Sequence, residues 1–402
     1  MPTPFDPLRI GPLTLRNRFI KSATNEGMAR AGLPTPLLVE HHREIAAGGA
    51  AMTTVAYCAV SADGRTFENQ ILLDTESVPH LRRLTDAVHA EGAAACAQIT
   101  HGGAFNFLRK LTTRWPSSAS GGFNPPGLLV GRWFKQAMDE AALMRCAAEF
   151  VAAARNARAA GFDAVELHMG HGYLLSQFLS PKYNRRRDAW GGSAAQRAAF
   201  PALVLRNVLD AVGSEMAVSC KLSVTEGFNG GGTAEDASDI AKVLEASGAH
   251  LLVLSGGMNV ESPWAIFGSP LPAAAGGPVD TAFARAAGRL MMLTAPKTVF
   301  RELYLRPHSQ QVRAAVRMPL AYLGGAKSLA GIRSLLDEGF DGIAMGRALL
   351  HEPALINQFR DGLADRSGCT ACNQCVAEMY KPGGTRCVLR PENDARLNVR
   401  PA

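Results

Sequence analysis

The stretch AAGFDAVELHMGHGYLLSQFLSP, residues 159–181, decides the fold. It begins with the end of an alanine-rich helical segment, turns at Gly161, and continues as the short apolar run 163–169. Two other helical segments end in a similar way, in AAGGA and ASGAH, directly before an apolar run. Because glycine is typical of a helix C-terminus, the repeated ending indicates a chain of alternating helices and strands.

Eight apolar runs of strand length follow this rhythm. Their continuous apolar character indicates strands that are buried on both faces. The helical segments between them include one at 233–250, with Thr233 as the expected N-cap. Eight such units without a switch point predict an α/β fold, a (β/α)8 TIM barrel, and a doubly wound sheet is the alternative. The expected strands are 18–24, 52–60, 93–99, 163–169, 217–223, 250–256, 319–325 and 342–348.

The residues left over by the eight units fall in three places. We expect a barrel over 1–363 with insertions at about 104–137, after the third strand, and about 258–307, after the sixth. A cysteine-rich tail over 364–402 is expected to pack on the barrel. Both insertions lie on loops that follow strands, which is the catalytic face of such a barrel, so they are expected to cap a pocket.

Composition narrows the class of protein. The chain has 402 residues, 47% of them hydrophobic, and a formal net charge of +7. Its basic residues are dispersed without interleaved aromatic residues, which argues against nucleic acid as a partner. We find no run of membrane length and no signal-peptide pattern, so the expected location is the cytoplasm.

Glycines follow the last two expected strands, in LGG (323–325) and MGR (345–347). Backbone N–H groups at Gly324, Gly325 and Gly346 can approach a phosphate closely, and Arg347 adds a bidentate donor. This is where phosphate cofactors bind in many barrels. The alternative is that these are two tight turns that need glycine for their conformation.

A lysine and a glutamine accompany this predicted phosphate site. Lys221 lies in the middle of an expected barrel strand, and a buried lysine is unfavourable unless it faces a charge. Gln98, near the end of a neighbouring strand, offers both a donor and an acceptor. Together they suggest a planar, phosphorylated cofactor across the strand ends, and FMN fits this description.

Several segments carry a resemblance to a known family. LRNRFIKSATNEG, AQITHGG, ELHMGHGYLLSQFLSP with NRRRDAWGGS, and GIAMGRALLHEP resemble the Old Yellow Enzyme family of FMN-dependent ene reductases over nearly the whole chain. The resemblance implies that the following residues bind FMN: Ser22, Ala23, Thr24, Asn25, Tyr57, Gln98, Lys221, Gly257, Gly324, Gly325, Met345, Gly346 and Arg347. Asn25 stands where the family usually has threonine or cysteine, and Tyr57 stands where small residues are commoner; its ring could equally belong to the core.

The resemblance also implies the catalytic residues. His168 and His171 would donate hydrogen bonds to the carbonyl of an activated alkene, and Tyr173 would protonate the α-carbon, with NAD(P)H as the reductant. Two histidines three apart could also bind a metal with Glu166, but no further ligand stands nearby. A dinucleotide loop is excluded because MGHGYLL lacks the third glycine.

The tail holds four cysteines with a spacing that is typical of metal sites: Cys369, Cys372, Cys375 and Cys387. They resemble the 4Fe-4S motif of dienoyl-CoA reductases and trimethylamine dehydrogenases. Zinc and four free thiols remain alternatives. A cluster would call for an external electron carrier.

Three functions therefore stay open. The leading one is reduction of activated C=C bonds of small molecules with NAD(P)H. The others are an iron–sulfur flavoprotein of the dienoyl-CoA reductase or amine dehydrogenase type, and a non-enzymatic flavin-binding redox sensor. The sequence leaves homo-oligomer formation open.

Overall fold

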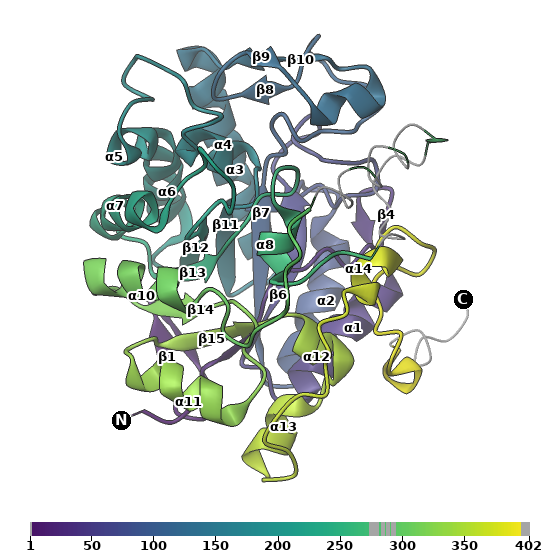
Figure 1. The fold of residues 1–402 in the computed structure, drawn as a ribbon. Helices are drawn as coiled ribbons and strands as arrows, with labels where there is room; N and C mark the ends of the chain where they lie inside the picture. The colour runs from purple at the N-terminus through teal and green to yellow at the C-terminus, as the bar shows by residue number, and fades with distance from the viewer. Residues whose placement is uncertain (1, 273–280, 283–285, 287–289, 291–294, 395–402) are drawn as a thin grey trace.

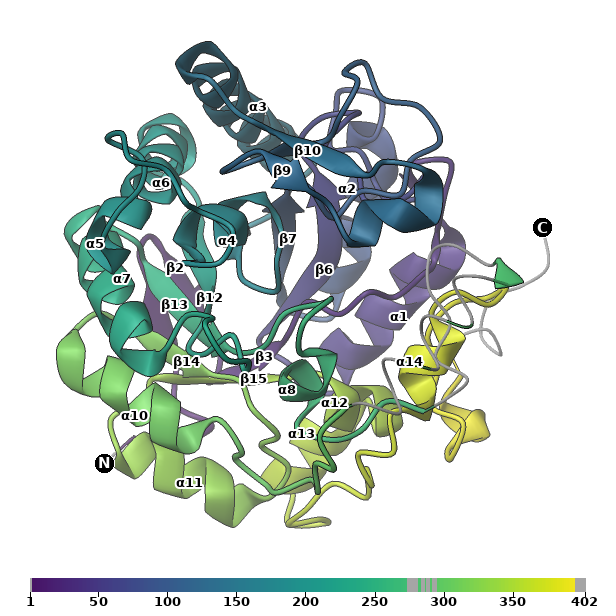
Figure 2. The ribbon, with the colours of Figure 1, turned by 45° about the horizontal axis from the view of Figure 1, so that its top comes forward.

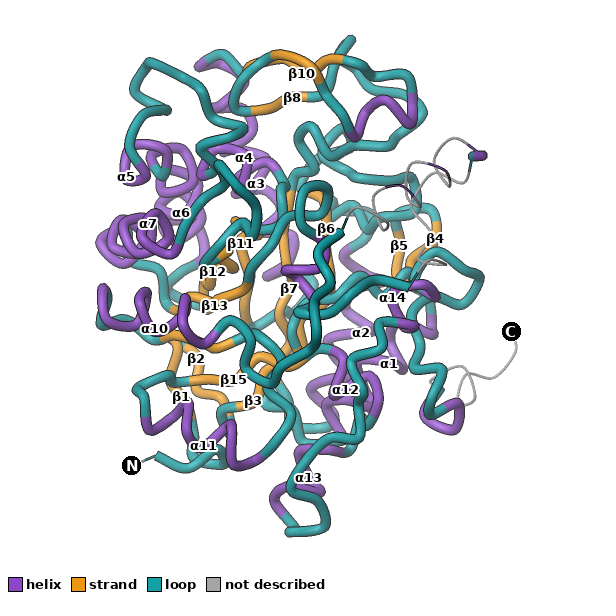
Figure 3. Tube along the Cα trace, in the orientation of Figure 1, coloured by secondary structure: helices purple, strands orange, loops and turns teal. Residues whose placement is uncertain are grey.

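Eight parallel strands close into a barrel in this computed structural model, which describes residues 2–272, 281–282, 286, 290 and 295–394. The centre of the 258–307 insertion and the last residues of the tail lie outside the described residues. The strands lie at the centre of the molecule (Figures 1 and 3). In barrel order they are β11 (Ala164–Met169), β12 (Ala217–Ser223), β13 (Leu251–Ser255), β14 (Leu320–Tyr322), β15 (Gly342–Met345), β3 (Phe19–Lys21), β6 (Met52–Ala59) and β7 (Ala94–Thr100).

The TIM barrel prediction is therefore confirmed. The observed β14 and β15 are shorter than the predicted 319–325 and 342–348. Both strands end just before or at the glycine-containing turns, and Gly346 is already the N-cap of α12 (Arg347–His351).

An outer layer of helices surrounds the strands (Figure 2). Their apolar faces and the outer faces of the strands form the main core. The expected N-cap at Thr233 is confirmed, since it forms a capping box with Asp236. The side chain of Asp139 caps the helix that begins at Glu140 by accepting a hydrogen bond from Ala142 N–H. The main helices of the layer are α1 (Pro36–Ala47), α2 (Val78–Ala90), α3 (Glu140–Ala159), α6 (Ala199–Val212), α7 (Ala234–Ala246), α10 (Arg306–Ala315) and α11 (Leu329–Asp337).

A small hairpin that the sequence patterns did not predict closes the N-terminal end of the barrel. Strands β1 (Leu8–Ile10) and β2 (Leu13–Leu15) pair antiparallel. Leu8, Ile10 and Leu15 pack with interior strand residues such as Ile20 in a second buried cluster. The long loops therefore cover the opposite end of the barrel, at the C-terminal ends of the strands.

The two insertions and the tail meet at that opposite end. The first insertion folds into the small sheet β8 (Ser117–Ser118), β10 (Phe134–Ala137) and β9 (Gly122–Phe123), with a 3-10 helix at Pro126–Val130. The second contributes α8 (Pro263–Phe267) and the tail contributes α14 (Gln374–Glu378), as Figure 2 shows. Asn373, the N-cap of α14, donates from Nδ2 to Ser269 Oγ at 2.9 Å and so joins the two segments. The remaining short elements are β4 (Ala29–Arg30), β5 (Leu33–Pro34), α4 (Leu174–Leu179), α5 (Ala194–Arg197), α13 (Leu355–Arg360) and a 3-10 helix at Pro391–Asn393.

Hydrogen bonds tie the tail to the loop after β3. Thr385 N–H donates to Glu26 O at 2.7 Å, and Thr385 Oγ1 donates to Asn25 O at 2.8 Å. The backbone oxygen of Met379 lies so close to Gly27 that a Cβ there would stand 2.0 Å away. Glycine at position 27 therefore permits the tail to pack here. None of the described helices is long and apolar enough to cross a membrane.

Candidate active site

Three predicted side chains come together at the C-terminal end of β11. His168 is the second-last residue of the strand, His171 lies in the loop after it, and Tyr173 is the N-cap of α4. The ring of His168 is 5.0 Å from that of His171 and 4.6 Å from that of Tyr173, centroid to centroid. His171 adopts φ of +60°, a left-handed conformation that is unfavourable for a residue other than glycine. Such strain is typical of functional loops.

Both histidines are neutral at physiological pH. Burial is the main cause that lowers the pKa of His171 to about 3 and that of His168 well below its usual value. Lys221 adds to both effects by charge repulsion. Nδ1 of His168 accepts a hydrogen bond from Gly170 N–H at 3.3 Å, so Nε2 carries the proton and is a donor.

Tyr173 is in a protonated state that can donate. Its side chain is buried among Tyr57 and Phe105, with ring centroids 5.2 and 5.8 Å away. Burial raises the pKa of Tyr173, while hydrogen bonds with Tyr57 and Asn259 act in the opposite direction. The Tyr57 ring thus packs directly against Tyr173 at the cavity wall.

Lys221 meets a charge, but the charge belongs to the protein. Its Nζ is 3.0 Å from Glu166 Oε1 and donates to Ser22 Oγ at 3.1 Å. Gln98 Nε2 donates to the same Glu166 oxygen at 2.7 Å. A cofactor is therefore not needed to balance the charge of Lys221, because Glu166 from the adjacent strand already does so.

A second buried ion pair lies at the C-terminal end of the barrel strands. The sequence patterns did not predict it. Lys21 and Glu26 are 2% exposed and bonded to each other, and His42 Nε2 is 3.8 Å from Glu26. Burial lowers the pKa of Lys21 and raises that of Glu26, against the mutual attraction of the pair. Lys21 also lines the cavity described next.

Two adjoining cavities open at this end of the barrel. One is lined by the predicted catalytic trio together with Gln98, Asn25 and Tyr57, and the other by Ser22, Gly325, Met345 and Lys327. Both are lined by Ala23, Thr24, His171, Gly346 and Arg347, so the two cavities share a wall. Of the residues predicted to bind FMN, Lys221, Gly257 and Gly324 do not line either cavity.

Arg347 has partners within the protein. Its guanidinium donates to Phe267 O, Ser269 Oγ and Asn373 Oδ1 and lies 5.7 Å from the centroid of the Phe300 ring. It thus joins the second insertion to the tail. Lys327, which the sequence patterns did not single out, is a second cation in the glycine-lined cavity. Its Nζ donates to Cys369 O at 2.9 Å.

The four tail cysteines line one small cavity with His351 and Arg347. Among the described residues, one group of potential metal ligands has its ligand atoms all within 4.8 Å of one another. It consists of His101, Cys146 and Glu149. The tail sulfurs are therefore spread more widely than the spacing of about 3.8 Å that tetrahedral zinc requires. By the same test, His168, His171 and Glu166 do not form a metal group.

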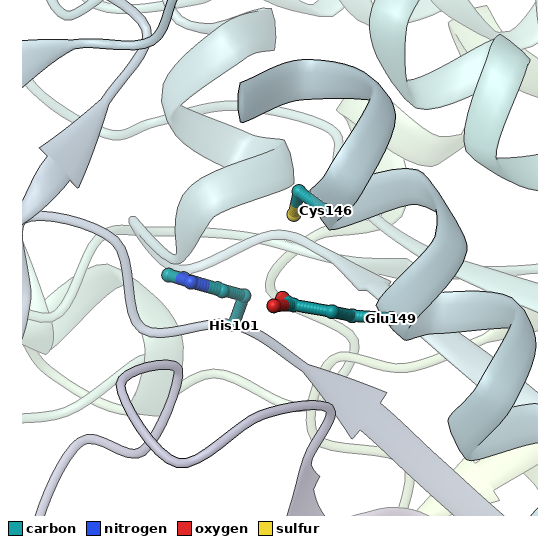
Figure 4. A group of neighbouring side chains, drawn as sticks. All are labelled: His101, Cys146 and Glu149. Carbon is teal, nitrogen blue, oxygen red and sulfur yellow. The ribbon is translucent and has the colours of Figure 1, made fainter. Parts of the chain in front are cut away.

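The His101 group supports the active-site loop. In Figure 4 the carboxylate of Glu149 and the sulfur of Cys146 extend from α3 toward His101. Burial lowers the pKa of His101 to about 4, so its ring is neutral, and Nδ1 accepts a hydrogen bond from Gly103 N–H at 3.0 Å. The carbonyl of His101 accepts from Leu174 N–H at 2.8 Å, which fixes the residue after Tyr173.

Comparison with known proteins identifies the family. The model of the NADH:flavin oxidoreductase / NADH oxidase family matches residues 4–262. The chain belongs to this family. The NADH:flavin oxidoreductases bind FMN and include relatives named NADH oxidase and NADPH dehydrogenase. The resemblance to Old Yellow Enzyme is thus confirmed.

The chain covers different shares of the length of two relatives. It is 43% identical to 4,4'-dithiodibutanoate disulfide reductase of Rhodococcus erythropolis, over 97% of this chain and 96% of the relative. It is 30% identical to the metal reductase of Desulforamulus reducens, over 99% of this chain but 55% of the relative. It therefore spans nearly all of the first and about half of the second.

Solved structures share the fold of this family member. The Old Yellow Enzyme homologue of Zymomonas mobilis gives a TM-score of 0.71 at 22% identity, over 98% of this chain and 99% of that one. Morphinone reductase in complex with tetrahydroNAD gives 0.70 at 22% identity, over 93% and 94%.

Proposed function

We propose that this FMN-dependent oxidoreductase reduces activated C=C bonds of small α,β-unsaturated carbonyl compounds with NAD(P)H. The observation that carries the proposal is that His168, His171 and Tyr173 share one cavity, which adjoins a glycine-lined cavity. The overall reaction takes NAD(P)H, a proton and the alkene to NAD(P)+ and the saturated product.

The residues present fit FMN. Gly325, with φ of +80°, and Gly346 both line one of these cavities, and a glycine backbone can approach a phosphate closely. Lys327 and Arg347 supply positive charge there, and Gln98 faces the cavity at the ring end. When bound, FMN supplies hydride chemistry to the pocket.

The protein's own groups act on the substrate. Neutral His168 and His171 donate N–H bonds to the substrate oxygen and polarise it, which makes the β-carbon electrophilic. His171 Nε2 and Ser255 Oγ are 2.8 Å apart, which orients the ring. Tyr173, protonated through burial, then gives its proton to the α-carbon.

Substitution Tyr173→Phe tests this assignment, since it keeps the ring and removes only the acid. Reduction of bound flavin by NAD(P)H should persist, while reoxidation by 2-cyclohexenone should slow by about 10²-fold or more. Stopped-flow flavin absorbance separates the two half-reactions. Unchanged reoxidation would remove Tyr173 from the proton-donor role.

Disulfide reduction is a second candidate. It is favoured by the 43% identity to a disulfide reductase that this chain matches over nearly its full length. Reduction of an R–S–S–R bond by NAD(P)H and a proton yields two thiols, with a thiolate as the leaving group. Turnover of 4,4'-dithiodibutanoate and of 2-cyclohexenone by the same preparation decides between the two functions.

We further propose that the tail cysteines hold a 4Fe-4S cluster rather than zinc. The four cysteines line one cavity, no three of their sulfurs lie within 4.8 Å of one another as zinc ligands would, and Cys375 also lines the active-site cavity. Such a cluster would pass electrons between the flavin pocket and an external carrier. About four irons per chain in anaerobically purified protein, absent in Cys372→Ser, are expected; stoichiometric zinc would contradict the proposal.

A further inference from the structure

A broad groove adjoins the active-site cavity on the side of the tail. It is formed by the loops after β3, β6 and β7 and by the tail segment that follows α14. The groove and the cavity share Asn25, Tyr57, Met379 and Tyr380 as walls. A molecule that reaches Tyr173 can therefore extend along this groove to the surface.

Aromatic rings line the path from the catalytic tyrosine outward. Tyr173 packs against Tyr57 at 5.2 Å, Tyr57 against Phe67 at 6.1 Å, and Phe67 against Tyr380 at 6.5 Å, centroid to centroid. Such a series offers apolar faces to a carbon chain or a conjugated segment. The inner part of the groove is thus suited to the body of a substrate rather than to its charged end.

Two arginines along the outer part of the groove have guanidinium groups that are available to bind a ligand. Arg30 and Arg109 line it and are exposed. Neither guanidinium has a hydrogen-bond or ion-pair partner among the described residues, and the bond from Arg109 to Glu68 comes from the backbone N–H of Arg109. Two unpaired guanidinium groups at one groove give a site where a carboxylate can accept charge-assisted hydrogen bonds.

The other charged groups of the groove do not cancel this excess. Lys381 pairs with Glu378 at 2.7 Å, and Glu26 is bonded to buried Lys21. Glu68 is the remaining carboxylate on the groove wall, and one of its oxygens accepts the backbone N–H of Arg109 at 2.9 Å. The groove therefore keeps a net positive charge in front of the aromatic path.

We propose that the physiological substrate is an anion whose carboxylate binds Arg30 and Arg109 while its reducible bond lies at Tyr173. This inference rests on the proposed function and specifies its substrate class. The aromatic path between the two ends accommodates the apolar segment that joins them.

A series of enones that carry a carboxylate on tethers of two to six methylene groups tests the proposal. The matching methyl esters serve as neutral substrates. For the wild-type holoenzyme, at least one acid of the series should have a kcat/KM about tenfold or more above that of its ester, through a lower KM. This advantage should shrink at high salt.

The arginine variants locate the effect. Arg30→Gln and Arg109→Gln should each lower kcat/KM for the preferred acid by about five- to tenfold, with ester turnover unchanged. Arg155→Gln, an exposed arginine on α3 outside the groove, is the matched control and should change neither. Arg30→Lys should retain part of the preference.

Three results would overturn the proposal. The first is equal turnover of acids and esters across the whole series. The second is an equal loss for acids and esters in the variants. The third is a loss confined to the half-reaction with NADH or NADPH, which would assign the arginines to the cofactor's phosphates. Because ester turnover by the wild type tests ene reduction by itself, a failure of the proposed function is distinguishable from a failure of this inference.

Discussion

Replacing Lys221 by methionine should destabilise the protein by about 3 kcal/mol. The side chains of Lys221 and Glu166 are 1% and 4% exposed, and their charged atoms are 3.0 Å apart. Removing one partner of a buried pair costs about 3–5 kcal/mol because the other charge stays buried alone. Gln98 still donates to Glu166 at 2.7 Å, so we expect the lower end of this range.

The assay is urea denaturation of the flavin-free protein, followed by tryptophan fluorescence at pH 8. The double variant Glu166→Gln with Lys221→Met should be more stable than Lys221→Met alone, which gives a coupling energy of about 1–3 kcal/mol.

A loss below about 1 kcal/mol for Lys221→Met, or additive effects in the double variant, would refute the reasoning. Either result would mean that the pair is solvated in the flavin-free protein. A conservative control is Lys242→Met, because Lys242 and its partner Asp239 are about half exposed; it should change stability by less than about 1 kcal/mol.

Two further predictions concern the active-site loop and the glycine-lined cavity. Because the pKa of His171 is about 3 in the folded state and about 6.5 when unfolded, the unfolded state alone takes up a proton as the pH falls from 6.5 toward 3, and stability is lost over that window. His171→Gln should make the unfolding free energy less steep by about 1.4 kcal/mol per pH unit between pH 6 and 4; an unchanged slope in denaturation curves would contradict this. Gly325→Ala should weaken FMN retention and stability more than Gly230→Ala does, since both have φ near +80° but only at Gly325 would a Cβ meet Phe300, at 3.0 Å. Flavin release on dilution and thermal unfolding measure this difference, and equal effects of the two variants would show that the contact with Phe300 is unimportant.

Local patterns predicted the repeating units because each unit is specified by its own residues. Continuous apolar runs define the strands, and glycine or a side-chain cap defines the helix ends, as at Thr233. The predicted trio of His168, His171 and Tyr173 is local too, since all three belong to one strand end and the loop after it. Short sequence separation is why their proximity could be read from the chain.

Other features depend on contacts between segments that are distant in the chain. They could be found only in the tertiary structure. The ion pair of Lys221 with Glu166 arises because β11 and β12 lie side by side with His168 opposite Lys221. Barrel closure itself pairs β15 with β3, from opposite ends of the chain. Nothing in the local pattern around these residues records such neighbours.

The same holds for the surroundings of the active site. Sequence patterns were enough to predict the barrel, the family and the strand ends at which the candidate site lies. The tertiary structure decided that the tail lies over the loop after β3, that Arg347 bonds to Asn373, and that Arg30 and Arg109 share a groove. Loops and tails have no periodicity that fixes their path, so their positions follow from packing and hydrogen bonds with segments that are far away in the chain.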